Sequence, residues 1–458
     1  MDKNRVVIIG GGISGLCTAY YLRDLAEKNS LPIDITLLER SNRFGGVIRT
    51  SSHDTFLTEA GPDAFESDRD VKELCRDLGL AKELVAANPC FRKFFLLKKE
   101  KLLPVAVSPG AFLRAPFLSL PSKFRMLLEP FVPAGAGDPN ESLGSFITRR
   151  LGAGFLKEFI DPLARGIYMT AAGELSLEAN FPGLRESERI CGSLRNAFRA
   201  GQGLRKSPDA DGFFTLKGGL EVLTRALVHA LEVCELRPGA PVDHCDYDGE
   251  WKIFLENGES LRADSVCLAM TTFDAAKLLP ICAPGLSQEL LSVRYDSIAA
   301  VSLVFRAEDV PASPMDFGFI VPAVMGDRPF SSLKWLGKTP TGTHIILKIF
   351  LSEAMLPEFF CENNEMLLQR ILTTLAELFG IRALPQTMTV ERYPEALPQY
   401  APGHGNRIRA ITERLVDHPG LYLTGNAFHG FGITDCIREA RKTAEAIFAQ
   451  SRSFLPAL

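Results

Sequence analysis

The sequence lacks the patterns that hold metals or cross membranes. Its ten cysteines include no C-x-x-C pair, and its seven histidines form no H-x-x-x-H pair or other metal-type cluster. We therefore predict no metal site and expect reduced, buried thiols, among them Cys17, Cys75 and Cys267, which lie in apolar surroundings. The chain also contains no run of 18 or more apolar residues, so we expect no transmembrane helix.

A large net charge and a leader segment are missing as well. The formal net charge is −4, which gives no reason to expect a nucleic acid as partner. The first apolar run begins directly after Arg5, so we expect no signal peptide and predict a cytoplasmic protein. At 458 residues, 46% of them hydrophobic and 23% charged, the chain is typical of a globular protein of two or three domains.

What the chain does contain, at its start, is the pattern of a dinucleotide-binding βαβ unit. An apolar run at 6–9 leads into Gly10, Gly12 and Gly15, a helix-like segment follows, and a second apolar run ends at Glu39. Gly10 permits a tight turn, Gly12 lets a pyrophosphate approach the backbone, and Gly15 lets the helix pack on the strand. N–H groups at the helix start hold phosphates, and Glu39 is placed to bind a ribose. The predicted contacts are Gly10, Gly11, Gly12, Ile13, Ser14, Gly15, Glu39 and Arg40.

A second pair of glycines distinguishes between the dinucleotides. Arg43, Gly45 and Gly46 follow Glu39 in the pattern E-x-x-x-R-x-G-G, which resembles the extension found in FAD-binding amine oxidases and related flavoproteins. A second turn close to the phosphates suits a long dinucleotide that lies across the sheet, and NAD sites usually lack it. We therefore predict FAD as the cofactor. The alternative is a glycine-rich turn without a ligand.

The pattern along the rest of the chain predicts an α/β protein whose nucleotide domain is discontinuous. Residues 251–270 fit two strands about an Asn257-Gly258 turn, and 298–305, 317–321 and 344–350 are β-like runs of a second sheet. Between 91 and 214 the pattern is helical and loop-rich, with many prolines. The predicted division assigns 1–65, 215–275 and 395–458 to FAD binding, 66–90 and 276–394 to substrate binding, and 91–214 to a helical domain.

Four further segments, together with residues 56–65, resemble one enzyme family over almost the entire chain. The segments are DPLARGIYMTAAGELSLEANFP (161–182), FTLKGGLEVL (214–223), ERYPEALPQYAPGH (391–404) and LYLTGNAFHGFGITDCIREARKTAEAI (421–447). They resemble the oxygen-dependent, FAD-containing protoporphyrinogen/coproporphyrinogen III oxidases of the flavin amine oxidase superfamily. The resemblance implies a p-hydroxybenzoate-hydroxylase-like FAD domain of Rossmann type, a substrate domain built on an antiparallel sheet, and a helical domain that can contact membranes.

The resemblance also implies roles for residues far from the first glycine turn. Gly425 and Gly432-Ile433-Thr434 match the loop that passes the flavin ring, with Thr434 as a suitable N-cap for the closing helix. Such a helix start would place positive partial charge near the flavin, whereas the alternative is an ordinary capped helix. Val242 matches a backbone contact to adenine and equally suits a strand core. Further implied cofactor contacts are Gly61, Pro62, Asp63 and Ala64.

Arg165 and Gly166 match the family's stretch beside the reactive face of the flavin. A glycine there would let a flat macrocycle lie against the ring, and the alternative is a glycine at a helix end. The chain departs from the family just beyond, where residues 169–173 read Met-Thr-Ala-Ala-Gly in place of the usual Ala-Gly-Asp. The resemblance therefore does not predict the shape of the pocket rim.

Positive charge is concentrated in residues 91–125, where eight Lys or Arg residues stand against Glu100 alone and alternate with six phenylalanines. Such a segment suits anionic propionates or the surface of an anionic bilayer, and the alternative is a solvated charged face. Arg92 and Lys93 fall near the family's substrate-carboxylate arginine, so the resemblance assigns them to the substrate.

The predicted reaction is the oxidation of a porphyrinogen to the porphyrin in haem biosynthesis, by three two-electron steps. Each step needs a hydride acceptor, which the flavin supplies, and the loss of an N–H proton. His404 and His429 suit structural roles and no other general base is obvious, so we predict catalysis by positioning, with molecular oxygen as acceptor. The alternatives are another enzyme of the superfamily, such as an amine oxidase or desaturase, and a non-catalytic flavin- or porphyrin-binding protein.

The sequence leaves several points open. It does not distinguish protoporphyrinogen IX from coproporphyrinogen III, because that depends on how many cationic side chains face the pocket. It also leaves open whether the chain forms a homodimer, whether it contacts the next haem-pathway enzyme, and whether it lies peripherally on the inner face of the cell membrane.

Overall fold

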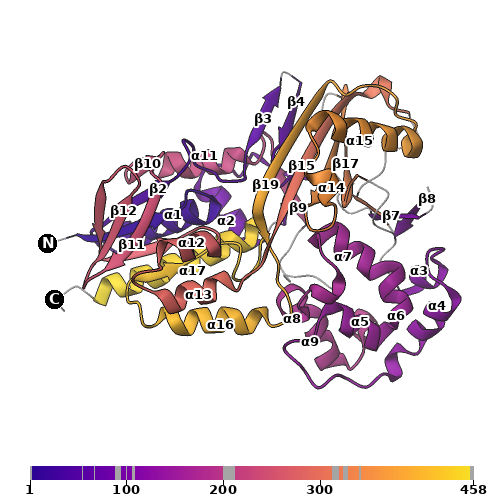
Figure 1. The fold of residues 1–458 in the computed structure, drawn as a ribbon, viewed down its shortest axis with the longest axis horizontal. Coiled ribbons are helices and arrows are strands. Elements are labelled where there is room, and N and C mark those ends of the chain that lie inside the picture. Colours follow the sequence, from indigo (N-terminus) through magenta and orange to yellow (C-terminus); the bar gives the residue numbers. More distant parts are fainter. Residues whose placement is uncertain are drawn as a thin grey trace.

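The structure is a computed structural model that describes residues 3–53, 55–66, 68–87, 94–98, 101–105, 109–199, 212–311, 319–322, 329–339 and 342–453. Figure 1 shows the arrangement of its parts. Strands and helices from both ends of the chain lie together on the left, a second sheet rises at the upper right, and a group of helices lies at the lower right.

A five-stranded parallel sheet forms the first part. Its order is β10-β2-β1-β14-β20. The strands are β1 (Asn4–Ile9), β2 (Ile33–Glu39), β10 (Glu235–Pro238), β14 (Ser265–Leu268) and β20 (Leu421–Leu423). Because β1 lies between β2 and β14, the strand order reverses at β1. Open α/β sheets bind ligands at such a switch point, beyond the carboxyl ends of the strands.

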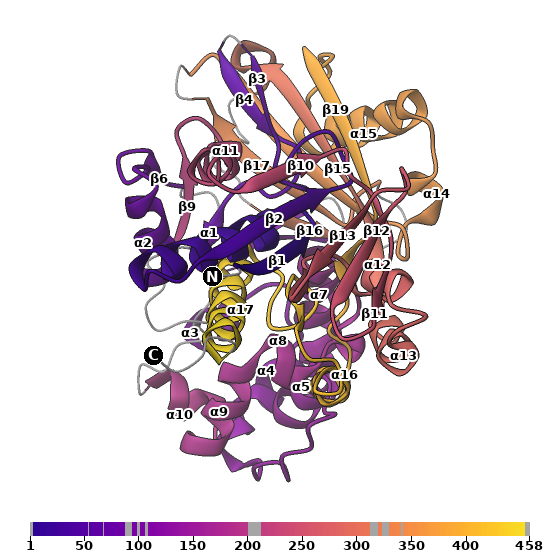
Figure 2. The ribbon, with the colours of Figure 1, turned by 90° about the vertical axis from the view of Figure 1, so that its left-hand side faces the viewer.

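Both faces of this sheet are covered, which explains the unbroken apolar run of β1. On one face, Ile8 packs against Leu16 of α1 (Ile13–Lys28) and Ile437 of α17 (Ile433–Ser453). On the other face, Val7 packs against Trp251 of a small antiparallel sheet. Figure 2 shows α1 and the yellow α17 close to β1. Strands buried on both faces are hydrophobic at every position, as at residues 6–9.

The small sheet confirms the predicted hairpin. It contains β11 (Val242–Tyr247), β12 (Trp251–Leu255) and β13 (Ser260–Ala263), paired antiparallel. Gly258 lies in the turn between β12 and β13 with φ of +86°, a conformation that favours glycine.

A seven-stranded sheet forms the second part. Its order is β19-β15-β18-β17-β16-β7-β8. The strands are β7 (Phe94–Lys98), β8 (Lys101–Val105), β15 (Tyr295–Arg306), β16 (Phe319–Pro322), β17 (Ser332–Lys338), β18 (His344–Ser352) and β19 (Thr387–Pro398). All neighbours are antiparallel except β16 and β7, which are parallel, so the sheet is mixed rather than purely antiparallel.

The two faces of this sheet differ in character. Leu303, Leu347 and Ile349 pack against α15 (Asn364–Phe379). Their neighbours along the strands, which include Ser302 and Lys348, point to the opposite face because successive side chains of a strand alternate. That opposite face carries polar groups and is turned toward the nucleotide-binding part.

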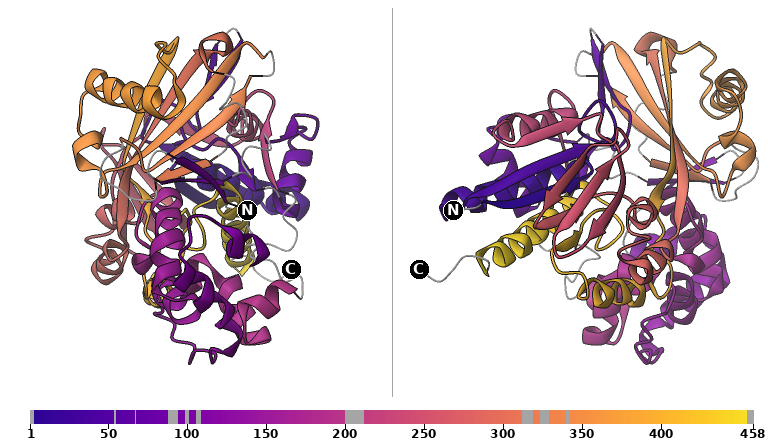
Figure 3. Two further views of the ribbon diagram at one scale, coloured as in Figure 1. Left: turned by 90° about the vertical axis from the view of Figure 1, so that its right-hand side faces the viewer. Right: turned by 60° about the vertical axis from the view of Figure 1, so that its left-hand side comes forward.

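The sequence predicted a helical domain over 91–214. The structure corrects this in part, because β7 and β8 within that segment belong to the seven-stranded sheet. Most of the segment's other described residues form short helices around Phe146, Phe155 and Phe159, and its last two residues begin a further strand. The helices are α3 (Pro109–Arg114), α4 (Leu120–Leu127), α5 (Leu143–Leu151), α6 (Ala153–Phe155), α7 (Asp161–Tyr168), α8 (Leu177–Asn180), α9 (Pro182–Cys191) and α10 (Leu194–Arg199). Figure 3 shows these purple helices below the orange strands of the seven-stranded sheet.

The remaining elements complete these parts. They are β3 (Thr50–His53), β4 (Phe56–Glu59), β5 (Phe65–Glu66), β6 (Leu84–Ala86), β9 (Phe213–Leu216), α2 (Arg69–Asp77), α11 (Glu221–Ala230), α12 (Thr272–Leu278), α13 (Pro284–Leu291), α14 (Pro357–Phe360) and α16 (His404–Leu415). Of these, α2 and α11 share a core with α1, α12, α13 and α16 share one with the small sheet, and α14 packs with the seven-stranded sheet. Within the described residues, no helix is both long and apolar enough to cross a membrane. Nor do three or more metal-ligating side chains gather anywhere in that part of the chain.

Candidate cofactor and substrate site

The first glycine turn has the geometry that a dinucleotide requires. Gly10 adopts φ of +111°, and its N–H donates to the carbonyl of Leu38 at 2.8 Å. A Cβ on Gly15 would lie 1.9 Å from the carbonyl oxygen of Gly10, so only glycine lets α1 start this close to the strand. A Cβ on Gly12 would meet nothing within 4 Å, which leaves open space beside the helix start. The turn therefore fits a pyrophosphate.

Glu39 lies beside this turn, at the carboxyl end of β2. Its Oε2 accepts from the backbone N–H of Gly11 at 2.7 Å, and its Oε1 accepts from that of Ser41 at 2.8 Å. The carboxylate is thus fixed in place and keeps lone pairs for a ribose hydroxyl. The exposed side chain of Arg40 reaches Asp274 at 3.4 Å.

Val242 is brought to the same end of the sheet. The N–H groups of Gly239 and Ala240 donate to the carbonyls of Ser41 and Glu39, at 2.8 and 2.9 Å. These bonds hold the start of β11 next to the end of β2. The adenine contact predicted for Val242 is consistent with this place.

The second glycine turn packs on the first. The N–H of Gly45 donates to the carbonyl of Gly11 at 2.8 Å, and a Cβ on Gly46 would lie 3.2 Å from the Cα of Gly12. Gly45 and Gly46 have φ of +113° and +57°. The guanidinium of Arg43 donates to carbonyls of this turn, including those of Gly46 and Ile48. Arg43 thus holds the turn in shape, a role that its position in the sequence did not reveal.

The distant C-terminal loop meets these turns at one edge of the parallel sheet. The N–H of Ala269 donates to the carbonyl of Ile9 at 2.8 Å, and that of Thr424 donates to the carbonyl of Leu268 at 3.1 Å. The carboxyl ends of β1, β14 and β20 therefore lie at the same edge of the sheet. The C-terminal loop starts just after β20, and its Gly425 has φ of +139°.

The predicted N-cap role of Thr434 is wrong. Helix α17 begins at Ile433, and the carbonyl of Gly432 accepts from the N–H of Cys436, so Thr434 already lies in the first turn. Its hydroxyl donates instead to the carbonyl of Glu66. Asp435 also lies in the first turn, where an acidic residue suits the positive end of the helix dipole.

Tyr400 fixes the loop before α17, and sequence reasoning missed this role. Its hydroxyl donates to the carbonyl of Asn426 at 2.6 Å and accepts from the N–H of Gly430 at 2.8 Å. Burial raises the pKa of the phenol well above its usual value, so the hydroxyl stays protonated. The phenol ring stacks on the imidazole ring of His404, with 4.0 Å between the ring centroids. The motif that contains Tyr400 was visible in the sequence, but not its partners.

The two histidines of the predicted motifs have different surroundings. His404 is buried, and burial lowers its pKa to about 4, so the imidazole is neutral at physiological pH. His429 is mostly exposed, with its Nε2 3.9 Å from a carboxylate oxygen of Glu439. Neither arrangement is that of a base held against a substrate, which agrees with the prediction of structural roles.

Residues 61–64 lie between the second glycine turn and the seven-stranded sheet. A Cβ on Gly61 would be 2.3 Å from the carbonyl oxygen of Val47, so the segment packs tightly on the turn. Asp63 is buried and forms ion pairs with Lys348 of β18 at 2.6 Å and with Lys334 of β17 at 3.1 Å. A lysine within the apolar run of β18 was the sequence signal for this cluster, and it was not recognised.

The structure gives Gly166 a packing reason of its own. A Cβ there would lie 2.2 Å from a methyl carbon of Val321, so glycine lets α7 approach β16 closely. Arg165 forms an ion pair with Asp161 at 2.8 Å. Their place beside the flavin stays a prediction. Arg92 and Lys93, assigned to the substrate, lie outside the described residues.

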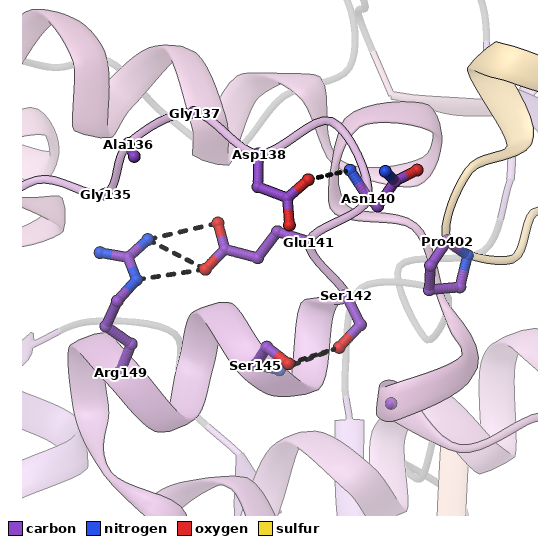
Figure 4. A pocket seen from close by; sticks show the side chains of 11 residues that line it. Gly135, Ala136, Gly137, Asp138, Asn140, Glu141, Ser142, Ser145, Arg149 and Pro402 are labelled. Carbon is purple, nitrogen blue, oxygen red and sulfur yellow. Dashed lines mark hydrogen bonds and ion pairs between the residues drawn. The ribbon is translucent and has the colours of Figure 1, made fainter.

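A separate pocket of about 440 Å³ lies between the helical part and Pro402 (Figure 4). The charged and polar side chains that line it bond with one another. Arg149 pairs with Glu141, and the Ser142 hydroxyl donates to that of Ser145 at 3.0 Å. These residues include none of the predicted cofactor contacts, so the pocket is distinct from the cofactor site.

Comparison with known proteins identifies the family. Residues 13–448 match the family described as flavin containing amine oxidoreductase, and the chain belongs to this family. It is therefore a flavin-dependent oxidoreductase, and the dinucleotide-binding unit makes that flavin FAD, as predicted.

Relatives within the family carry the predicted names. The chain is 30% identical to the coproporphyrinogen III oxidase of Bacillus subtilis (strain 168), over 96% of this chain and 97% of that protein. It is 28% identical, with a TM-score of 0.84, to a crystal structure from Exiguobacterium sp. 255-15 named as a candidate protoporphyrinogen oxidase, over 98% and 100% of the two chains. The cyclohexylamine oxidase of Brevibacterium oxydans IH-35A, at 17% identity, TM-score 0.71 and 98% and 100% coverage, shares the fold alone.

Proposed function

We propose that this oxidoreductase converts a porphyrinogen to the porphyrin by three two-electron dehydrogenations, with molecular oxygen as electron acceptor. The observation that carries the proposal is the extent of the similarity to a coproporphyrinogen III oxidase. It covers 96% of the chain and therefore includes the seven-stranded sheet as well as the cofactor turns. The amine oxidase shares the fold at only 17% identity.

The chain's own residues would act by binding and orientation. We assign the pyrophosphate to the turn at 10–15, the ribose to Glu39, and the flavin ring to the loop at 425–434 that Tyr400 holds. When bound, FAD supplies the hydride-accepting chemistry. The residues described above would fix where the substrate meets the flavin. Such positioning alone can raise the rate of a reaction by many orders of magnitude.

Porphyrin fluorescence tests the proposal. Purified holoprotein would be mixed with coproporphyrinogen III or protoporphyrinogen IX, and in parallel with a panel of primary and secondary amines monitored for peroxide. We expect fluorescence to rise faster than the spontaneous oxidation in boiled-enzyme controls for at least one porphyrinogen. Turnover of amines without porphyrin formation would contradict the proposal, and the ratio of kcat/KM for the two porphyrinogens reports the preferred number of propionates.

Replacing His429 with alanine is expected to leave porphyrin formation within about threefold of the wild type. The side chain is mostly exposed and its Nε2 lies 3.9 Å from a carboxylate oxygen of Glu439, whereas loss of a general base typically costs at least about 100-fold. The measurement is kcat on flavin-replete protein. A loss of porphyrin formation in this variant would identify His429 as a base.

We also propose peripheral contact with an anionic membrane through α4 and the short helix η2 (Glu129–Phe131). Large apolar side chains are exposed here: Leu120 is 80%, Phe124 65% and Phe131 83% exposed. Arg114 adds exposed positive charge nearby. An apolar surface with cationic residues beside it is typical of helices that lie in a bilayer interface.

Replacing Phe124 and Phe131 together with serine is expected to weaken binding to vesicles of phosphatidylglycerol and phosphatidylcholine by about tenfold or more, because each ring buries apolar area in the bilayer. Co-sedimentation measures the bound fraction. Val416→Ser, which removes an exposed side chain at the end of α16, is the matched control. Equal binding of the wild type and the double variant would contradict the assignment of this surface.

A further inference from the structure

An ammonium group in the middle of an apolar strand connects the two halves of the site. Lys348 of β18 is 1% exposed. Its neighbours Leu347 and Ile349 point to α15, so Lys348 points the other way, toward residues 59–63. Its ammonium donates to the carbonyl of Glu59 at 2.9 Å, to the carbonyl of Gly61, and to Oδ1 of Asp63 at 2.6 Å. All three of its protons are therefore given to one short segment.

That segment also contacts the cofactor turns. Gly61 packs on the carbonyl of Val47, which directly follows the second glycine turn. At its start, the carboxylate of Glu59 accepts from the N–H of Leu220 and from the hydroxyl of Thr50, both at 2.8 Å. Residues 59–63 are thus held from two sides, by the nucleotide-binding part and by β18 of the seven-stranded sheet.

Lys348 and Asp63 form an ion pair, with 2.6 Å between Nζ and Oδ1. Burial lowers the pKa of Lys348, and the neighbouring carboxylate opposes that change. Burial alone would raise the pKa of Asp63, but Lys348 and Lys334 together hold it below its usual value. A well-packed apolar pair gives comparable stability to a buried ion pair. What the charged pair adds here is direction, because charge-assisted hydrogen bonds fix the orientation of the segment.

We propose that Lys348 is a positioning residue, which fixes residues 59–63 between the second glycine turn and the seven-stranded sheet and thereby sets where the substrate lies relative to FAD. The proposal rests on the proposed function, since it takes the sheet to hold the porphyrinogen. Displacement of reacting groups by about 1 Å costs roughly 100-fold in rate, so the loss of this contact has a measurable consequence.

Three variants separate positioning from charge balance. Lys348→Met removes every hydrogen bond from Lys348 to the segment and leaves Asp63 paired with Lys334, whereas Asp63→Asn keeps the two bonds from Lys348 to backbone carbonyls. The double variant removes both charges. Lys252→Met in β12, which removes a lysine that pairs with Asp248 near the surface, is the control. Each holoprotein is measured for Tm, for kcat/KM with the preferred porphyrinogen, and for the visible circular dichroism of bound FAD.

We expect Lys348→Met to lower kcat/KM roughly 10- to 100-fold and Asp63→Asn to lower it less. In the double variant Tm recovers relative to Lys348→Met, but kcat/KM does not, and the dichroism bands remain changed. The control matches the wild type in all three. Wild-type kcat/KM in Lys348→Met, or recovery of kcat/KM together with Tm in the double variant, would overturn the proposal.

The dichroism separates a failure of this proposal from a failure of the proposed function. If the wild type forms no porphyrin from either substrate, the proposed function fails, and the bands of bound FAD still report the segment. Changed bands in Lys348→Met then support its role in placing residues 59–63 against the cofactor. Unchanged bands overturn it.

Discussion

Replacing Gly12 with aspartate is expected to abolish FAD retention while the fold stays intact. Gly12 has φ of −74° and ψ of −176°, which any residue can adopt, and a Cβ would meet nothing within 4 Å. Gly12 is the N-cap of α1, a position where aspartate stabilises a helix. The added carboxylate would, however, occupy the space assigned to the pyrophosphate. Repulsion between like charges should raise the Kd for FAD by roughly 100-fold or more.

The measurement is the ratio of flavin to protein after gel filtration, with Tm of the apoproteins measured alongside. We expect the Gly12→Asp apoprotein to melt at or above the temperature of the wild-type apoprotein. Gly405→Asp is the matched control, because a Cβ on Gly405 also meets nothing within 4 Å and the residue lies in the first turn of α16. Wild-type flavin content in Gly12→Asp would mean that the phosphates lie elsewhere.

Replacing Arg150 with methionine is expected to cause the largest loss of stability, about 3–5 kcal/mol for the helical part. Arg150 is 0% exposed and its Nε donates to the buried carboxylate of Glu129 at 2.9 Å. It also donates to the carbonyls of Val132 and Gly192, both at 2.9 Å. The variant leaves a carboxylate buried without this cation, which costs more than the pair itself contributes.

Urea unfolding followed by circular dichroism measures this loss. Arg189→Met, which breaks an exposed ion pair with Glu186 on α9, is the control and should change the midpoint little. Adding Glu129→Gln to Arg150→Met should restore part of the loss, because the buried charge is then gone. A midpoint for Arg150→Met equal to that of the control would show that the buried pair is not what holds η2 to α5.

The nucleotide-binding unit could be predicted because its signals are local. The turn at Gly10, the helix after it and the acidic end of β2 follow one another within 40 residues, and each has its own steric or electrostatic reason. The strands β7 and β8 were missed for the opposite reason. Phe94–Lys98 pairs with the nearby β8, but it joins the seven-stranded sheet through β16, more than 200 residues away, and no local pattern announces that partner.

The details of the site that sequence reasoning missed are contacts between distant residues. Thr434 is a good N-cap residue by type, but α17 begins at Ile433, so Gly432 takes the N-cap position two residues before Thr434. A glycine at position 166 suits close approach to a ligand and close packing on the Val321 side chain equally well, so the sequence could not distinguish the two. Lys348 stands 285 residues from Asp63, so its ion pair became visible only in the folded chain.

Anaerobic reduction of the bound flavin tests most directly whether the two distant glycine segments hold an FAD that oxidises porphyrinogens. Oxygen-free holoprotein would be mixed in a stopped-flow instrument with coproporphyrinogen III or protoporphyrinogen IX, and the flavin absorbance near 450 nm recorded as a function of substrate concentration. We predict rapid, saturable bleaching with at least one porphyrinogen and return of the absorbance when oxygen is admitted. A flavin that stays oxidised with both porphyrinogens yet is bleached by an amine would contradict the proposed function.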